Sequence, residues 1–252
     1  MSKIIRVNKH IHTGLQAVTR LPEDQLVYKE LSVPLKLPSG VDLRSRMPPV
    51  YDQGQLGSCT ANAICAAIGF DLPGFVGSRL FVYYNERVLE GTVNTDAGAF
   101  LRDGVKSLST WGICPETLWP YIINQFRVKP PENCYQAALA HRSPKAVNIK
   151  NTLADMKGCL SAGFPFVVGI LVYSSFETNK VAATGIVSMP GPKERLLGGH
   201  AVLICGYDDT RQWWIARNSW GSVWGDRGYF YLPYDYLLNN RLSSDLWSID
   251  FI

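Results

Sequence analysis

A cysteine stands where a glycine-rich loop runs into a helical pattern. The stretch QGQLGSCTANAICAAIGF spans residues 53–70, and Cys59 lies at the junction of its two halves. The unpaired N–H groups and the positive dipole end of a helix N-terminus favour the thiolate over the thiol. Because the thiolate is the nucleophilic form, this position suits nucleophilic catalysis. Gly57 allows the chain to turn tightly before the helix.

The same loop offers donors for an oxyanion. The N–H of Cys59 is unpaired in the first helical turn and can donate to developing negative charge. Gln53 stands six residues upstream, and its side-chain amide supplies a second donor if the loop folds it back. The loop therefore predicts a nucleophile and two oxyanion donors close together.

A thiol nucleophile also needs a base, and His200 is the best placed of four histidines. It follows two glycines in LLGGHAVLICGYD, at the mouth of an apolar strand; the other three stand at positions 10, 12 and 141. Asn218 comes eighteen residues later, in WIARNSWGSVWGDRGY. Its amide oxygen can accept from the imidazole N–H and orient the ring. Trp220 and Trp224 are positioned to shield that bond from water.

These three motifs together resemble the papain-like cysteine peptidases. They are Gln-Gly…Gly-Ser-Cys, Gly-His-Ala and Asn-Ser-Trp-Gly-x-x-Trp-Gly-x-x-Gly-Tyr, and Cys59 and His200 are 141 residues apart. The resemblance runs from about Leu37 to the C-terminus. Its start, LPSGVDLR, is similar to the beginning of the mature enzymes, and Trp119-Pro120-Tyr121 is similar to their Tyr-Pro-Tyr loop.

The resemblance implies an endopeptidase that forms a thioester with polypeptide substrates. Cys59 would be the nucleophile and His200 the general base and then acid. Asn218 would orient the imidazole, and Gln53 with the Cys59 N–H would form the oxyanion hole. No cofactor and no metal are expected, because the six cysteines stand singly and show no metal-ligand spacing.

The resemblance also implies where substrate binds. We expect the wall that holds the residue before the cleaved one to lie near Gly98, Ala99, Phe100 and Gly169, with an apolar or aromatic preference. Residues beside the catalytic positions complete the expected substrate-binding set: Gly57, Gly199 and Trp220.

The chain departs from the family at its usual cysteines. Leu56 stands where relatives have a cysteine, and Thr60 where they have an aromatic residue. Their Cys-Asn-Gly-Gly segment corresponds here to TDAG, residues 95–98, and Asn85 stands near the expected partner of Cys134. We therefore expect the usual disulfides to be absent, in agreement with a reducing compartment.

The pattern along the chain predicts an α+β protein with two lobes. Apolar spacing predicts helices over 59–70, 79–90, 99–108 and 152–162, while short β-branched and aromatic runs predict antiparallel strands within 164–173, 200–208, 212–220 and 228–233. With the resemblance, this becomes a papain-like fold with a helical N-terminal lobe, an antiparallel β-barrel-like C-terminal lobe and the active-site cleft between them. The expected limits are about 53–145 and about 146–252, within a peptidase domain of residues 37–252.

Residues 1–36 lack strong periodicity and are expected to form an extended arm. Papain-like peptidases commonly carry an inhibitory prosegment, usually a longer one. The arm therefore has two interpretations: a short propeptide that lies across the cleft and is removed on activation, or an ordered belt along the lobes.

Other functions on the same scaffold stay open. One is a catalytically silent binding protein whose cleft is permanently filled by the arm. Another is an exopeptidase, or an acyl transferase with an amine acceptor in place of water. No insertion that could hold a chain terminus is evident for an exopeptidase.

Composition limits the partners. Hydrophobic residues make up 46% and charged residues 18% of the 252 residues, which is typical of a chain with a substantial core. The net charge is 25 − 21 = +4 without a long basic run, so nucleic-acid binding is not expected. No apolar run has the length of a signal-peptide core or a membrane span. We therefore expect a monomer without membrane contact, cytoplasmic or delivered by a non-classical route.

Overall fold

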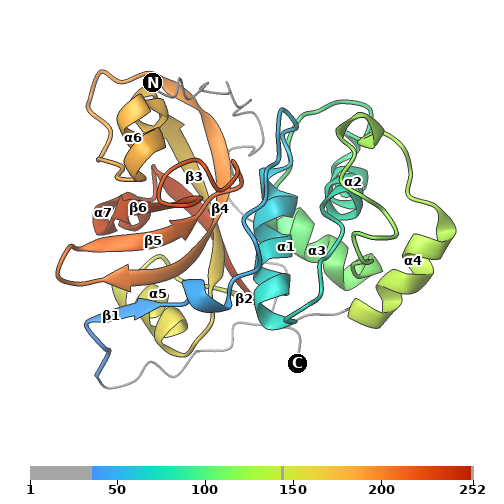
Figure 1. Cartoon of the computed structure of the whole chain (residues 1–252), viewed down its shortest axis with the longest axis horizontal. Helices are drawn as coiled ribbons and strands as arrows, with labels where there is room; N and C mark the ends of the chain where they lie inside the picture. Colours follow the sequence, from blue (N-terminus) through green and yellow to red (C-terminus); the bar gives the residue numbers. More distant parts are fainter. Residues whose placement is uncertain (1–35, 143–144, 251–252) are drawn as a thin grey trace.

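The computed structural model describes residues 36–142 and 145–250, and it combines helices with an antiparallel sheet (Figure 1). The predicted arm lies outside the described residues, apart from Lys36. The helices are α1 (Cys59–Asp71), α2 (Arg79–Glu90), α3 (Leu101–Trp111), α4 (Glu132–Ala138), α5 (Leu153–Ser161), α6 (Asn179–Thr184) and α7 (Tyr234–Leu238). The strands are β1 (Gly40–Asp42), β2 (Lys145–Asn148), β3 (Phe166–Tyr173), β4 (Leu196–Asp208), β5 (Trp213–Arg217), β6 (Tyr229–Pro233) and β7 (Ser243–Asp250).

Local capping explains where the predicted helices begin and end. The Ser78 hydroxyl accepts from the Phe81 N–H ahead of α2, and Gly91 ends that helix in the left-handed region at φ 70°. Thr152 caps α5 by accepting from the Asp155 N–H, as its sequence predicts.

The third helix differs from its predicted limits of 99–108. Phe100 has an extended backbone (φ −94°, ψ 139°), and its N–H donates to the side chain of Glu90 at 2.8 Å. This bond holds the chain out of the helix for two residues, so α3 starts at Leu101 and continues to Trp111.

The helix α1 is the central element of the molecule. It lies between the other helices of its lobe and the sheet (Figure 1). Twelve of its thirteen residues are buried, which leaves it no solvent-facing side. One apolar cluster includes α1 residues together with sheet residues such as Ala201 and Leu203. The first turn of α1 is therefore held directly against β4.

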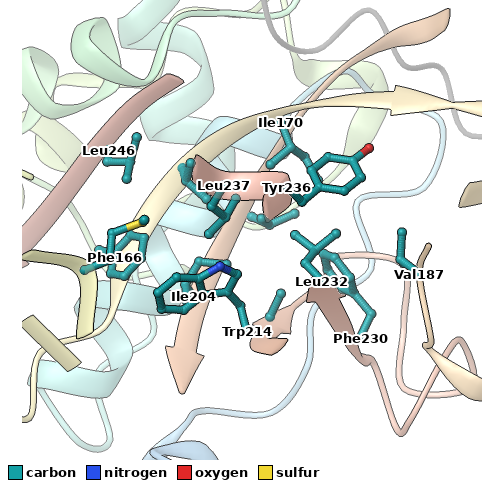
Figure 2. Close-up of a cluster of buried hydrophobic side chains, with 14 of the residues drawn as sticks. Phe166, Ile170, Val187, Ile204, Trp214, Phe230, Leu232, Tyr236, Leu237 and Leu246 are labelled. Carbon is teal, nitrogen blue, oxygen red and sulfur yellow. The ribbon is translucent and has the colours of Figure 1, made fainter. Parts of the chain in front are cut away.

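The sheet runs in the order β2-β7-β3-β4-β5-β6, and β1 pairs with β4. All paired strands are antiparallel. The side chains of β4 alternate between two clusters. Ala201 and Leu203 belong to the cluster with α1, whereas Val202 and Ile204 belong to the β lobe's own core. Figure 2 shows Ile204 in that core. Burial on both faces explains why these strands have apolar runs rather than alternating patterns.

Candidate active site

Cys59 is the first residue of α1, and the loop before it turns back on itself. The Gln53 side chain donates from Nε2 to the Leu56 carbonyl at 2.9 Å, which folds it along the loop. Its Oε1 accepts from the Ser219 hydroxyl at 2.5 Å, and its backbone N–H donates to the Ser219 carbonyl. The Gln53 side chain is therefore folded back along the loop that precedes Cys59 and tied to the β lobe.

His200 lies in β4, and Asn218 follows directly after β5. The Nε2 of His200 is 2.8 Å from Oδ1 of Asn218. Because an amide oxygen only accepts, this bond assigns the proton to Nε2 and leaves Nδ1 as the basic nitrogen. The same Oδ1 also accepts the Ser219 N–H at 2.8 Å, which fixes the amide's orientation.

Two tryptophans cover this pair. The Trp220 indole is stacked on His200, with ring centroids 4.9 Å apart and planes inclined by 28°. Trp224 packs edge-on against Trp220 at 5.0 Å. His200 and Asn218 are each 2% exposed, so their hydrogen bond is kept from bulk water.

A backbone group joins the nucleophile to the histidine strand. The N–H of Ala201, the residue after His200, is close enough to the Cys59 thiol to act to lower its pKa. The antiparallel sheet sets His200 beside Ile170 of β3, and α1 packs on the same strand. Cys59 and the strand that carries His200 thus come from different lobes, and α1 packs against that strand.

Burial decides the electrostatics of the thiol. Burial raises the pKa of Cys59 to about 12, whereas the N–H groups of Ala201, Thr60 and Cys59 itself act to lower it. The N–H groups at the helix start act in the expected direction, but removal from water outweighs them. A thiolate at neutral pH needs a positive charge beside it, which an imidazolium supplies.

A buried carboxyl group lies behind the nucleophile. The Thr60 hydroxyl donates to Glu86 Oε1 at 2.5 Å, and Glu86 is 0% exposed. Burial raises the pKa of Glu86 well above its usual value. Thr60 stands where relatives were expected to have an aromatic residue, so a polar pair occupies that space.

The expected substrate wall is assembled from distant segments. Gly169 of β3 is paired with Ala201 on one side and with Ser244 of β7 on the other. The Arg102 N–H at the start of α3 donates to Asp245 Oδ2 at 3.1 Å. These contacts draw the residues just before α3 toward β3, namely Gly98, Ala99 and Phe100.

The remaining expected binding residues lie beside the catalytic positions. Gly57 is buried, and its N–H donates to both carboxylate oxygens of Asp96 at 3.1 Å. Gly199 is paired with Leu171 directly before His200, and Trp220 stacks on that histidine.

Sequence analysis missed three contacts that hold the site together. They are the Ser219 hydroxyl on Gln53, the Ala201 N–H on Cys59, and the Asp96 carboxylate on Gly57. Ala201 directly follows His200 and Ser219 directly follows Asn218, so the motifs already placed both residues near the site. Nothing in the sequence pairs Asp96 with a loop 39 residues earlier.

No candidate metal site occurs among the described residues. Within 36–142 and 145–250, no three histidine, cysteine, aspartate or glutamate side chains gather as metal ligands. All six cysteines are free and buried. In the same part of the chain, no helix has the length and apolar character to cross a membrane.

Comparison with known proteins gives a consistent result. The model of the family described as papain family cysteine protease matches residues 37–242. A peptidase C1-like protein of Acanthamoeba polyphaga mimivirus is 44% identical over 212 residues, which are 79% of this chain and 68% of that protein. The cathepsin B-like protein CP3 of Giardia intestinalis is 31% identical over 77% of this chain and 68% of its own length.

Solved structures agree with the fold. The crystal structure of xylellain, a cysteine protease from Xylella fastidiosa, has a TM-score of 0.87 and 38% identity, and the alignment covers 97% and 98% of the two chains. Digestive procathepsin L 3 of Tenebrio molitor shares the fold at a TM-score of 0.69 and 21% identity, over 97% of this chain and 77% of that one. The two-lobe α+β prediction is confirmed.

Proposed function

This chain belongs to the papain family of cysteine proteases, and from that premise we propose that it is an endopeptidase acting through Cys59, His200 and Asn218. The observation that supports this most directly is the fixed imidazole. His200 bonds Asn218 through Nε2, while the N–H of the next residue, Ala201, acts to lower the pKa of the Cys59 thiol. Both observations support a Cys59 thiol beside the strand that holds the imidazole, with Nδ1 as the basic nitrogen.

In the proposed mechanism, proton transfer from Cys59 to His200 precedes attack. The thiolate adds to the peptide carbonyl, and a tetrahedral oxyanion forms. Imidazolium then protonates the leaving amine, and water releases the acid from the thioester with His200 as base. Asn218 holds the ring in the tautomer that both proton transfers need.

Two donors would receive the oxyanion. Gln53 Nε2 carries two hydrogens, and the Leu56 carbonyl takes one of them, so the second is available to substrate. The Cys59 N–H is in the first turn of α1 and supplies the other donor. Gln53 is 3% exposed, and low exposure strengthens such a bond.

The substrate would lie across both lobes. We place the side chain before the scissile bond near Gly98, Ala99, Phe100 and Gly169, where α3 and β3 are drawn together. Gly57, Gly199 and Trp220 flank the reacting carbonyl in this proposal. An apolar or aromatic residue fits the composition of that wall.

We further propose that the enzyme is made as a zymogen. The family match begins at residue 37, which leaves the 36-residue arm before the peptidase domain. A segment of that length can reach the site and occupy it until it is cut away. The two lobes, about 53–145 and 146–252, would then be the units between which substrate binds.

A thiol-directed label tests both proposals on the folded protein. A cleavage sequence inserted between residues 36 and 37 allows the arm to be cut after folding, with Cys59→Ala as the matched control. Labelling of Cys59 and cleavage of end-blocked peptides only after the cut are expected for a zymogen endopeptidase. Labelling before the cut would overturn the inhibitory role. No labelling in either form would favour the binding protein, and activity restricted to free-ended peptides an exopeptidase.

A further inference from the structure

One hydroxyl group bonds both ends of the loop that precedes Cys59. The Tyr121 hydroxyl donates to the Gln53 carbonyl at 3.0 Å and lies 2.5 Å from the Ser58 hydroxyl. Since its proton is given to Gln53, the Ser58 hydroxyl is the donor in the second bond. Gln53 and Ser58 are the residues at the two ends of the turn, and Ser58 directly precedes the nucleophile.

The tyrosine itself is firmly held. The Arg79 guanidinium lies 4.1 Å from the centroid of its ring and forms an ion pair with Glu116. Burial raises the pKa of Tyr121 to about 12, so its hydroxyl keeps its proton and continues to donate at neutral pH. Asn62 Nδ2 donates to the Ser58 hydroxyl at 3.1 Å and closes the network from α1.

The loop needs such support because it is short, rich in glycine and without a covalent crosslink. It contains Gly54 and Gly57, with Gly54 at φ 59°, and its Leu56 stands where a disulfide cysteine was expected from the family. Besides Tyr121, the Gly57 N–H links the loop to the rest of the helical lobe by donating to Asp96, and the buried Leu56 packs into the apolar cluster of that lobe. A flexible loop would let the two oxyanion donors drift apart.

We propose that Tyr121 is a positioning residue that sets the separation of the two oxyanion donors, Gln53 Nε2 and the Cys59 N–H. It touches neither the substrate nor the reacting atoms. It fixes the backbone at Gln53 and the residue before Cys59 with a single rigid group. This inference rests on the proposed oxyanion role of Gln53.

If Tyr121 positions the oxyanion donors, loss of its hydroxyl should affect only the steps that form an oxyanion. In Tyr121→Phe the ring and its contact with Arg79 remain, but both loop bonds are lost. We expect kcat to fall about tenfold with KM unchanged, since the donors act on the tetrahedral state rather than on bound substrate. A peptide aldehyde, whose adduct with the thiol carries such an oxygen, should bind about tenfold more weakly.

The rate of thiol alkylation distinguishes a positioning role from a merely structural one. A general disturbance of the site would slow alkylation, whereas a misplaced oxyanion donor would not. Iodoacetamide reacts with the thiolate by displacement of iodide and forms no oxyanion, so its rate with Tyr121→Phe should stay within about twofold of wild type. Tyr135→Phe is the matched control, because it removes a hydroxyl that bonds Asn85 at 3.0 Å in the same lobe. It should match wild type in all three assays.

Parallel variants separate the possible failures. If Gln53→Ala leaves turnover and aldehyde affinity intact, the proposed oxyanion role itself is wrong. If Gln53→Ala impairs both while Tyr121→Phe matches wild type, only the Tyr121 inference is overturned. An equal fall of turnover and alkylation in Tyr121→Phe would also overturn it. Should that variant not fold, Ser58→Ala, which removes one of the two bonds, is expected to show the same selective loss to a smaller extent.

Discussion

The first and second turns of α1 each carry a buried cysteine, and the two thiols have different surroundings. Cys59 is 1% exposed and Cys65 is 0% exposed, and burial raises the pKa of both. Three backbone N–H groups act to lower the pKa of Cys59, including that of Ala201 from the other lobe. Cys65 has charged side chains as its electrostatic neighbours, chiefly Glu116, which raises its pKa further.

This difference shows what makes one buried thiol suitable for catalysis. Burial in an apolar cluster gives an unreactive thiol, and most of the chain's cysteines are of this kind. At Cys59, the same burial is combined with oriented donors and a neighbouring histidine strand. In the proposed mechanism, the reactive state therefore depends on a partner from the β lobe and not on the helix start alone.

The largest expected effect comes from exchanging each of the two cysteines. Cys59→Ala should lower kcat/KM by at least about 10⁴-fold, because the thioester cannot form. Cys65→Ala should leave kcat/KM within about twofold and cost roughly 1 kcal/mol of unfolding free energy through lost packing. Peptide turnover and urea denaturation measure the two quantities.

The melting temperature controls for a change of fold. Cys59→Ala should lower the melting temperature about as little as Cys65→Ala, since both small sulfurs are buried in the same apolar cluster. Unchanged turnover in Cys59→Ala, or an equally large loss of turnover in Cys65→Ala, would contradict the view that only Cys59 is the reactive thiol.

A smaller effect should come from Glu86, whose charge acts on both thiols. Burial raises the folded-state pKa of Glu86 above its unfolded value, so the folded protein holds this proton longer than the unfolded chain. Stability is therefore lost as pH rises above the unfolded value and through the folded one. Glu86→Gln removes this titration and should raise the unfolding free energy at pH 8 by on the order of 1 kcal/mol.

Denaturation of wild type and Glu86→Gln at pH 4.5 and pH 8 tests this sign. The two proteins should be similar at the lower pH and diverge at the higher one. Since a negative Glu86 raises the pKa of both Cys59 and Cys65, the variant should leave the difference between the thiols in place. Parallel pH profiles would mean that Glu86 does not titrate differently on folding.

The positions proposed as catalytic could be picked out from sequence because local motifs carry them. A glycine-flanked cysteine at a helix start and the Gly-His and Asn-Ser-Trp motifs identified residues that the fold places together. The limits of α2 were also predictable, since Ser78 and Gly91 act within a few residues of its ends.

The rest depends on contacts between distant segments. The strand β7, SSDLWSID, is rich in serine and aspartate, and it becomes a strand because it pairs with β2 and β3. The bond from Ser219 to Gln53 joins residues 166 positions apart. The pKa of Cys59 could not be foreseen either, because it depends on how completely the fold excludes water.

The pH dependence of Cys59 alkylation, in wild type and in His200→Ala, tests the central claim most directly. In wild type, the imidazolium should keep the thiolate charged, so the rate should be nearly constant from about pH 5 to 8. In His200→Ala the buried thiol has no imidazolium beside it, so its pKa should lie well above neutral and the rate should rise about tenfold per pH unit between pH 7 and 10. A plateau retained in His200→Ala would contradict the claim, because the thiolate would then need no partner from the β lobe.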